Sequence, residues 1–396
     1  MTALVKLSWL NYRQRYMFQS SVFSFTIFIF HYHLTLLKEV RCDECFWEEN
    51  IYPGCSERIC RTFRCVMALA TFFMKKNAAS DIIINRQPFY DFFSVFYHYG
   101  LYAVELFFMI SGFIFFYLYA DNIHSNKTSA KTFIVNRVSR LYPLYIFTFA
   151  VVAILQIIFF KSHNYFFVYP MNDIYHAILN LLMIQSWGFE RGWSFNAPTW
   201  SVSIEVLMYM IFFILCKFTS KTTFISILIV ALSYYFFKIN NPIMIGAFSF
   251  FIGGLTYKIT IAVIKNISAK LFFIFACVFL LISWGVIFTL QVADIFSIIL
   301  FGFTSIIFFL VSISAIRNDF GKKIEWLGDI SYSSYLLHFP LQIIVVYLAD
   351  KIGYGRDLFY SPKVFILFML TLMAISYMSY IFIEKPSQQF IRDKFH

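Results

Sequence analysis

Ten long apolar runs, separated by short polar stretches, are the feature that most constrains how this chain folds. Each run is about 17 to 25 residues long, which as a helix is enough to cross the ~30 Å hydrocarbon core of a bilayer. Lipid offers no hydrogen-bond partners, so each spanning segment must satisfy its own backbone and is expected to be a helix. The chain has 60% hydrophobic and 13% charged residues, so lipid must solvate much of its surface. We therefore predict an all-α, polytopic integral membrane protein of about ten transmembrane helices, near 17–36, 96–120, 141–160, 200–218, 222–238, 243–260, 271–290, 293–315, 328–349 and 363–383.

The basic residues lie in short loops between the apolar runs, although the net charge of +11 is of a size that also occurs in nucleic-acid-binding proteins. Cytoplasmic loops of membrane proteins are rich in Lys and Arg. If the N-terminus is cytoplasmic and residues 37–95 are left out, the inner loops hold eighteen Lys and Arg and the outer loops six. We expect both termini in the cytoplasm and no nucleic-acid partner. The first run is too long for a signal peptide and has no small-residue cleavage site after it.

A short apolar segment at 176–187 cannot cross the bilayer, because it is only about 12 residues long. A stretch rich in Gly, Pro and Trp follows it at 188–198. Irregular backbone at membrane depth is tolerated only where it is buried in protein or lines a cavity. One interpretation is a re-entrant element that roofs a site on the outer side. The alternative is an ordinary amphipathic helix on the surface.

Residues 37–95 differ from the rest in composition. Cys42 and Cys45 have the spacing of half a zinc site, but no second Cys or His pair completes it. Disulfides would leave one thiol over, since the number of cysteines there is odd. Our preferred interpretation is a poorly ordered insertion or a disturbed reading frame, and we expect no metal. The five cysteines of the segment are Cys42, Cys45, Cys55, Cys60 and Cys65.

Two carboxylates lie inside apolar runs. Glu105 stands in the second run, and Glu205 stands about one and a half turns into the fourth, which Pro198 opens at its outer end. A charge at that depth costs roughly 3 kcal/mol on insertion scales, and such residues usually face a bundle interior. Tyr209 follows Glu205 at a spacing of four, on the same side of a helix. Structural pairing and substrate contact are both open for these carboxylates.

Imidazoles and guanidinium groups form the other candidates. His31 and His33 end the first apolar run, where a neutral imidazole can exchange a proton with a hydroxyl; an interfacial aromatic belt is the alternative. Arg137 and Arg140 are three residues apart and share a helix face. Guanidinium forks on one face suit phosphate oxygens, whereas ordinary membrane anchoring of basic residues is the alternative.

A stripe of polar residues lies along one side of the ninth run. Ser331, Tyr335 and His338 recur at spacings of four and three, so they share one face of an otherwise apolar helix. A polar face in lipid must turn inward, and hydrogen bonding between helices explains most such stripes. Glu384 closes the last run at the cytoplasmic side, where we expect it to cap and anchor the helix.

Taken together, these runs resemble the membrane-bound acyltransferase 3 family, whose bacterial members O-acylate cell-surface glycans. The resemblance rests on five motifs in the family's order: GLYAVELFFMISGF, NRVSRLYP, PTWSVSIEVLMY, LGDISYSSYLLHFP and FIEKP. They imply a membrane domain at 96–386, a first helix and an atypical segment at 1–95, and a short cytoplasmic tail at 387–396. The location implied is the bacterial cytoplasmic (inner) membrane.

The resemblance also implies an activity. The family's first helix carries a basic residue, ten intervening residues and an essential His; here FIFHYH resembles the His end, while Ser20 or Val22 holds the basic position. It implies acyl transfer, most commonly of acetyl, from acetyl-CoA to a hydroxyl of O-antigen, capsule, exopolysaccharide or another lipid-linked glycan. A membrane transporter of a glycan or lipid, and a catalytically impaired family member, are the alternatives. The expected roles are catalytic for His33, His31, Glu105 and Glu205, coenzyme-binding for Arg137 and Arg140, and substrate-binding for Trp200, Ser201, Tyr335 and His338.

Overall fold

The computed structural model describes residues 72–75, 78–79, 83–236, 241–290, 292, 294–316 and 330–395. The first expected span, His31, His33 and the five cysteines of the atypical segment lie outside the described residues. The described chain is helical apart from a two-residue antiparallel hairpin, β1 (Met74–Lys75) with β2 (Ala78–Ala79).

Eight helices in the described chain are long and apolar enough to cross a membrane, which confirms an all-α polytopic membrane protein. The expected run at 222–238 forms the shorter α8 (Thr222–Phe236). Other short helices are α3 (Tyr90–Tyr99) and α6 (Ile174–Leu181). The eight are α4 (Ala103–His124), α5 (Ala130–His163), α7 (Thr199–Phe218), α9 (Pro242–Asn266), α10 (Ala269–Thr289), the continuous run α11 (Ile295–Ser297), η9 (Ile298–Phe303) and α12 (Thr304–Ile316), α14 (Ser331–Ile352), and the run α15 (Pro362–Ser379), η12 (Tyr380–Glu384) and α16 (Lys385–Phe395).

Two of these helical runs, each of 34 residues, are longer than a bilayer requires. Helix α5 begins at Ala130 because the Ser129 side chain accepts the amide of Thr132 and caps the helix. The basic stretch before the third apolar run is therefore helical, and Pro143 lies inside the helix. At the other end of the chain, a π-helical turn, η12, carries the helix from α15 through Pro386 into α16. The last helix does not end at Glu384, and the expected tail is mostly helical.

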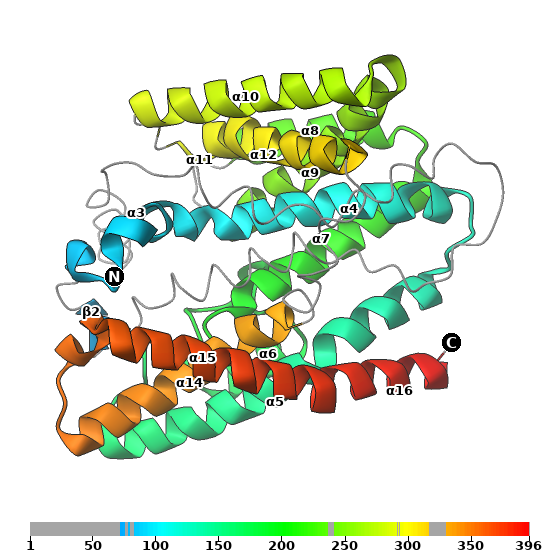
Figure 1. Ribbon diagram of the computed structural model, residues 1–396. Helices are drawn as coiled ribbons and strands as arrows, with labels where there is room; N and C mark the ends of the chain where they lie inside the picture. Colours follow the sequence, from blue (N-terminus) through cyan, green and yellow to red (C-terminus); the bar gives the residue numbers. More distant parts are fainter. Residues whose placement is uncertain are drawn as a thin grey trace.

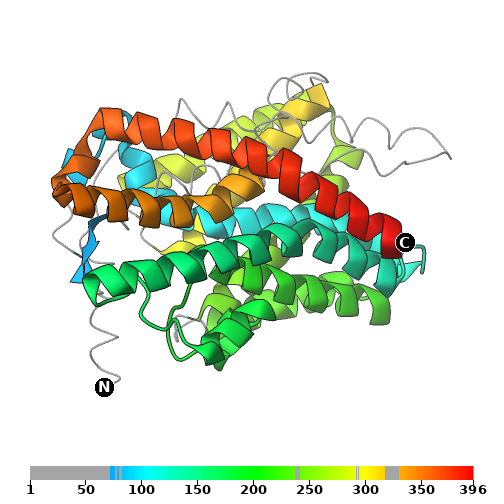
Figure 2. The same cartoon turned by 90° about the horizontal axis from the view of Figure 1, so that it is seen from below.

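The helices form two groups, each with its own apolar core. Helices α4, α7, α8, α9, α10 and α12 pack around one core and α15 packs around the other, while α5 and α14 contribute residues to both (Figures 1 and 2). Phe72 and Phe73 join the second core: their rings lie 4.4 Å from Phe359 and 4.5 Å from Tyr360. The end of the atypical segment is thus packed against the bundle, contrary to the expectation of a poorly ordered insertion throughout 37–95.

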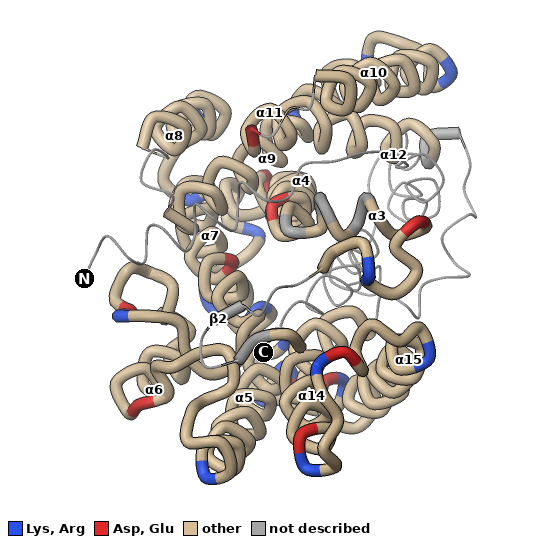
Figure 3. The backbone as a smooth tube through the Cα atoms, turned by 90° about the vertical axis from the view of Figure 1, so that its left-hand side faces the viewer, with Lys and Arg blue, Asp and Glu red and all other residues tan. Residues whose placement is uncertain are grey.

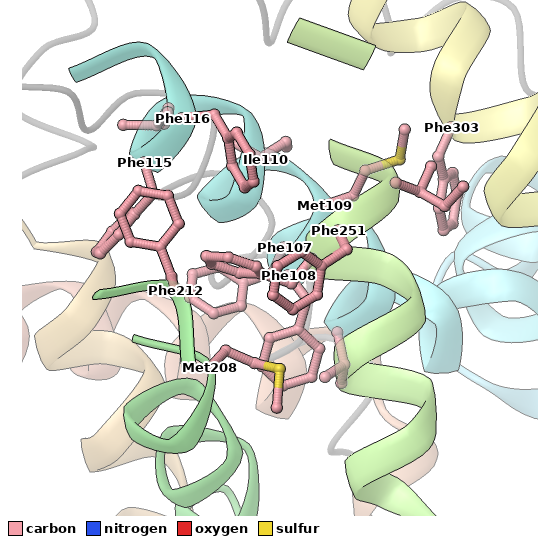
Figure 4. Packing of buried hydrophobic residues seen from close by; sticks show 14 of the residues in the cluster. Phe107, Phe108, Met109, Ile110, Phe115, Phe116, Met208, Phe212, Phe251 and Phe303 are labelled. Atoms are coloured by element: carbon pink, nitrogen blue, oxygen red, sulfur yellow. The ribbon is translucent and has the colours of Figure 1, made fainter. Parts of the chain in front are cut away.

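The closest helix pair is α4 and α9, which run side by side through the middle of the first group. A Cβ added to Gly112 would overlap the carbonyl oxygen of Phe250, and a Cβ added to Gly253 would overlap that of Met109. One glycine on each helix therefore lets the two backbones touch, as small residues do between membrane helices. Phe108, Phe116 and other large side chains pack around this contact (Figure 4).

The two ends of the bundle differ in charge. The end with the C-termini of α4, α7 and α9 and the N-terminus of α5 is called the basic end, and Lys217 bonds to Asn126 there. Its described basic residues are Lys127, Lys131, Arg137, Arg140, Lys217, Lys221, Lys258, Lys265, Lys270, Lys385, Arg392 and Lys394, against exposed Asp121 and Asp393. The opposite end mixes both signs (Figure 3), with Arg86, Asp91, Lys161, Asp294, Asp350, Lys351, Arg356, Asp357 and Lys363.

The glycine contact makes a prediction about stability. Gly112→Ala and Gly253→Ala each force a methyl group into a backbone carbonyl, so each should destabilise the protein by about 1–3 kcal/mol, the usual effect of overpacking. The measurement is the thermal unfolding midpoint of the purified protein in detergent. Gly285→Ala is the matched control, because nothing lies within 4 Å of an added Cβ there. An unchanged midpoint for Gly112→Ala would contradict the close contact.

Candidate active site

A hydroxyl cluster joins α7 to α14 where α7 begins. The Tyr335 hydroxyl donates to the carbonyl of Pro198 at 2.6 Å, and it lies 2.6 Å from Ser201 Oγ. Ser201 Oγ also lies 3.2 Å from the Pro198 carbonyl oxygen, so either hydroxyl can be the donor in the contact between Ser201 and Tyr335. Both side chains are 1% exposed, so no bulk water competes for these bonds. The structure thus brings together two of the predicted substrate-binding residues, and Trp200 is their half-buried neighbour.

His338 lies one turn beyond Tyr335 and is also buried. Its Nδ1 is 2.6 Å from the carbonyl oxygen of Tyr335. A carbonyl can only accept, so Nδ1 carries a proton and donates it to this oxygen. The polar stripe predicted on this helix is therefore buried at Ser331, Tyr335 and His338.

The carboxylate of Glu205 lies one turn after Ser201 on α7. It is 1% exposed and accepts a hydrogen bond from the Tyr209 hydroxyl. The Tyr209 ring stacks on Phe115 of α4 with centroids 4.1 Å apart. Helices α4 and α7 run toward the same end of the bundle (Figure 1), so that pairing places Glu105, also buried, at about the height of Thr199. Both predicted carboxylates therefore lie in the bundle interior near the hydroxyl cluster's height.

The segment before α7 reaches deep into the bundle. The Gln185 amide donates to the Tyr145 hydroxyl at 2.9 Å, near the middle of α5, and Asn196 donates to the carbonyl of Leu336 on α14 at 3.3 Å. The π-helical turn η7 (Gln185–Phe189) lies between them. The irregular backbone of this segment is thus buried in protein, and Pro198, which precedes α7, lies beside Tyr335, one turn into α14.

His176 resembles half of a catalytic dyad but is structural. Its Nδ1 lies 2.7 Å from Asp173, and its Nε2 accepts the amide of Arg191 at 3.2 Å, so neither nitrogen is left for proton transfer. Hydrogen bonds from the His176 amide and side chain hold the pKa of Asp173 below its ordinary value. Burial raises the pKa of Glu190, in the same segment, to about 7.

Arg137 is held against α4 at the basic end. It donates from Nη2 to the Tyr119 hydroxyl at 2.7 Å, and its guanidinium lies 5.3 Å from the Phe115 ring centroid. These contacts leave the planar group half-buried and oriented, unlike a freely solvated anchor. Arg140 is half-buried one turn along α5. The height of Arg140 relative to α14 is given by the next residue, Leu141, whose carbonyl accepts a hydrogen bond from the Tyr332 hydroxyl at 2.6 Å.

Glu384, to which the sequence analysis assigned capping and anchoring, is a further buried carboxylate. Its side chain is buried, 8% exposed, and it accepts a hydrogen bond from Ser333 Oγ at 2.8 Å. It stands at the last position of the π-helical turn η12, a feature often found at functional sites. The sequence contained a signal for this burial, because a carboxylate that directly follows an apolar run is expected to face the bundle interior, as Glu105 is. Gln185, Asn196 and Tyr145 carried no such signal.

The described residues hold no group of three or more His, Cys, Asp or Glu side chains placed to bind a metal ion. What they do hold is two buried carboxylates, a hydroxyl cluster and an imidazole inside the bundle, with Arg137, oriented by its contacts with α4, and half-buried Arg140 toward the basic end. This arrangement defines a polytopic membrane protein whose polar chemistry lies inside its helix bundle.

The chain belongs to the acyltransferase family, since residues 78–381 match the sequence model of that family's acyltransferase domain. It is similar to the acyltransferase MdmB of Streptomyces mycarofaciens, with 33% identity over 116 residues. That alignment covers 28% of this chain and 27% of the relative. No solved structure matches the chain.

Two tyrosines one turn apart allow a sharp test of the hydroxyl cluster. Tyr335→Phe removes the hydroxyl beside Ser201, while Tyr332→Phe removes one that bonds to Leu141 on α5. Each loses a buried bond to a backbone carbonyl, so each should cost about 1–3 kcal/mol of stability. Only Tyr335→Phe should also lower acyl-transfer kcat/KM by about tenfold or more. Equal activity losses in the two variants, measured at one temperature below both unfolding midpoints, would show that the cluster is purely structural.

Proposed function

We propose that this protein transfers an acyl group, most simply acetyl, from acyl-CoA to a hydroxyl of a cell-surface or lipid-linked glycan such as O-antigen, capsule or exopolysaccharide. The observation that carries the proposal is the separation of two kinds of site along one bundle. Arg137, oriented by its bond to Tyr119, and Arg140 lie toward the basic end, whereas the buried carboxylates and hydroxyls lie farther along the bundle. Membership of an acyltransferase family and an acyltransferase relative support it.

The donor enters from the basic end. Arg137 and Arg140 hold phosphate oxygens of coenzyme A, for which guanidinium forks are suited. Arg137 and Tyr145 are eight residues apart on α5, so these phosphates lie about 12 Å from the height of Gln185. The pantetheine arm of the donor covers that separation and brings the thioester to the polar centre.

Transfer requires a base and an oriented hydroxyl. His31 or His33 removes the proton of the glycan hydroxyl, whose oxygen attacks the thioester carbonyl; the C–S bond breaks and coenzyme A leaves with a proton. Glu105 or Glu205 orients that imidazole or binds sugar hydroxyls, and both assignments stand. A relay through an acyl-enzyme intermediate uses the same groups. His338 and Ser201 contact the acceptor alongside Trp200 and Tyr335.

The charge difference between the two ends supports an orientation. The basic end faces the cytoplasm, where acyl-CoA is made, and the mixed end faces outward. The bacterial cytoplasmic membrane is the proposed location, with the C-terminus inside and lipid covering the exposed apolar helix faces.

A transporter of a glycan or lipid is the second candidate, favoured by the irregular segment at 185–198 and by the buried carboxylates. Radiolabelled acetyl-CoA, supplied to membranes containing this protein, separates the two. The acyltransferase moves label onto glycan, whereas a transporter or an inactive family member leaves the glycan unlabelled.

The N-terminal imidazoles give the first kinetic prediction. Replacing both His31 and His33 by Ala should lower acetyl transfer by about 100- to 10,000-fold, which is the contribution of general acid–base catalysis. Protein abundance in the membrane should stay the same, as measured by immunoblot. Full activity in the double variant would refute the assignment.

The arginines give the second. Arg137→Gln with Arg140→Gln should raise KM for acetyl-CoA by about tenfold or more, because charge-assisted bonds contribute about 1.5–3 kcal/mol each. The KM for the acceptor should not change. Lys217→Gln with Lys221→Gln is the matched control, since it removes the same charge from the basic end without touching Phe115 or Tyr119. An equal rise in KM in both double variants would mean that only the general charge of this end matters.

A further inference from the structure

Two buried amide side chains in the segment before α7 have a fixed orientation. Gln185 Nε2 lies 3.0 Å from the carbonyl oxygen of Thr199, and Asn196 Nδ2 lies 3.3 Å from that of Leu336. A carbonyl oxygen only accepts, so the nitrogen of each amide must occupy these positions. The remaining atoms, Gln185 Oε1 and Asn196 Oδ1, are therefore oxygens and can act only as hydrogen-bond acceptors.

Neither oxygen has a donor within the described part of the chain. Gln185 is 3% exposed and Asn196 is 1% exposed, so bulk water does not reach them. Buried acceptors without partners are uncommon in native proteins and call for an explanation. Gln156 shows what a purely structural amide does here: its oxygen accepts the amide of Phe167 and its nitrogen donates to the Phe167 carbonyl, both at 2.9 Å.

The two amides lie beside the hydroxyl cluster. Thr199 connects them, since its hydroxyl donates to the Asn196 carbonyl at 2.7 Å while its own carbonyl accepts from Gln185. Two residues further along α7 is Ser201, bonded to Tyr335. The unsatisfied acceptors therefore lie close to the position where the proposed function needs an acceptor hydroxyl.

Aromatic rings adjoin the same segment. The ring centroids of Trp193 and Trp200 are 6.1 Å apart, and Tyr169 stacks on Trp193 at 5.9 Å. All three are only partly buried. The chain between them is held in the left-handed region at Phe195, where φ is 48°, a conformation that large side chains rarely adopt. Backbone strain of this kind persists where the surrounding structure imposes it, as at binding sites.

We propose that Gln185 and Asn196 form an acceptor subsite whose amide oxygens bind O–H donors of a polyhydroxylated, sugar-like molecule, with Trp193 and Trp200 covering its apolar ring faces. The inference rests on the proposed acyl transfer and adds to it the residues that select the acceptor. A hydroxyl donates to each orphan oxygen, whereas an alcohol with one hydroxyl satisfies at most one. Sites built to bind substrate hydroxyls discriminate strongly against analogues that lack them, because the protein groups are then left unpaired.

The test uses the full-length protein in detergent, radiolabelled acetyl-CoA, and a panel of methyl hexosides with cyclohexanol as the monohydric acceptor of similar ring size. Label should pass to at least one hexoside and not to cyclohexanol. Gln185→Met and Asn196→Leu keep the side-chain volume and remove the oxygens. Each should raise KM for that hexoside by about tenfold or more, while KM for acetyl-CoA changes less than twofold.

Gln156→Met is the matched control, because it removes a buried amide whose bonds are all internal. It should lower the unfolding midpoint without raising the hexoside KM. The thermal midpoint and the acetyl-CoA KM of each variant identify any variant that fails to fold. If both amide variants fail to fold, the wild-type protein is titrated with the hexoside and its tryptophan fluorescence is followed. The absence of a saturable fluorescence change would then overturn the subsite. Equal labelling of cyclohexanol, unchanged hexoside KM in the amide variants, or acetyl-CoA binding with no hexoside labelled also overturns it. Absence of acetyl-CoA binding is the separate failure of the proposed function.

Discussion

The absence of hydrogen-bond partners in lipid is the constraint on which this structure depends. Every polar side chain placed at membrane depth must find its partners inside the bundle or remain unsatisfied. Most find them: Tyr335 bonds to Pro198, Ser333 to Glu384 and Tyr209 to Glu205, in each case within or between helices. These bonds keep the polar atoms inside the bundle and leave the outer helix faces apolar. Among the described residues, the amide oxygens of Gln185 and Asn196 stay without a donor and are the most informative of these atoms.

Close packing makes that polar centre possible. The glycine contact between α4 and α9 brings the two helices together, and the aromatic side chains of α4 and α7 fill the space beside it (Figure 4). On the other side, α14 is held to α5 through Tyr332 and to the start of α7 through Tyr335. Helix α14 therefore couples the arginine-bearing end of α5 to the hydroxyl cluster. The donor and acceptor regions of the proposed reaction share one rigid element.

Much of the fold could be predicted from the sequence, because the length of an apolar run and the charges of its flanks depend on local composition alone. The spans at 96–120, 200–218, 243–260 and 271–290 correspond closely to α4, α7, α9 and α10. Helix ends were less predictable. Helix α5 begins earlier than expected because Ser129 caps it. The last helix continues past Pro386, which follows the π-helical turn η12. The burial of Glu105, Glu205, Tyr335 and His338 followed from their positions in apolar runs. The residues that pack beside these side chains could not be predicted in the same way.

The sequence by itself determined that the chain is a helical membrane protein, that its carboxylates and its Ser331–Tyr335–His338 stripe must face inward, and, through its motifs, that it belongs with the acyltransferases. Hydropathy and spacing carry that information because they act within a single helix. Only the tertiary structure decided which inward-facing groups meet, how deep the 185–198 segment reaches, and which amide oxygens are left without donors. Those features depend on contacts between residues as far apart as Asn196 and Leu336, and no local pattern encodes such a contact.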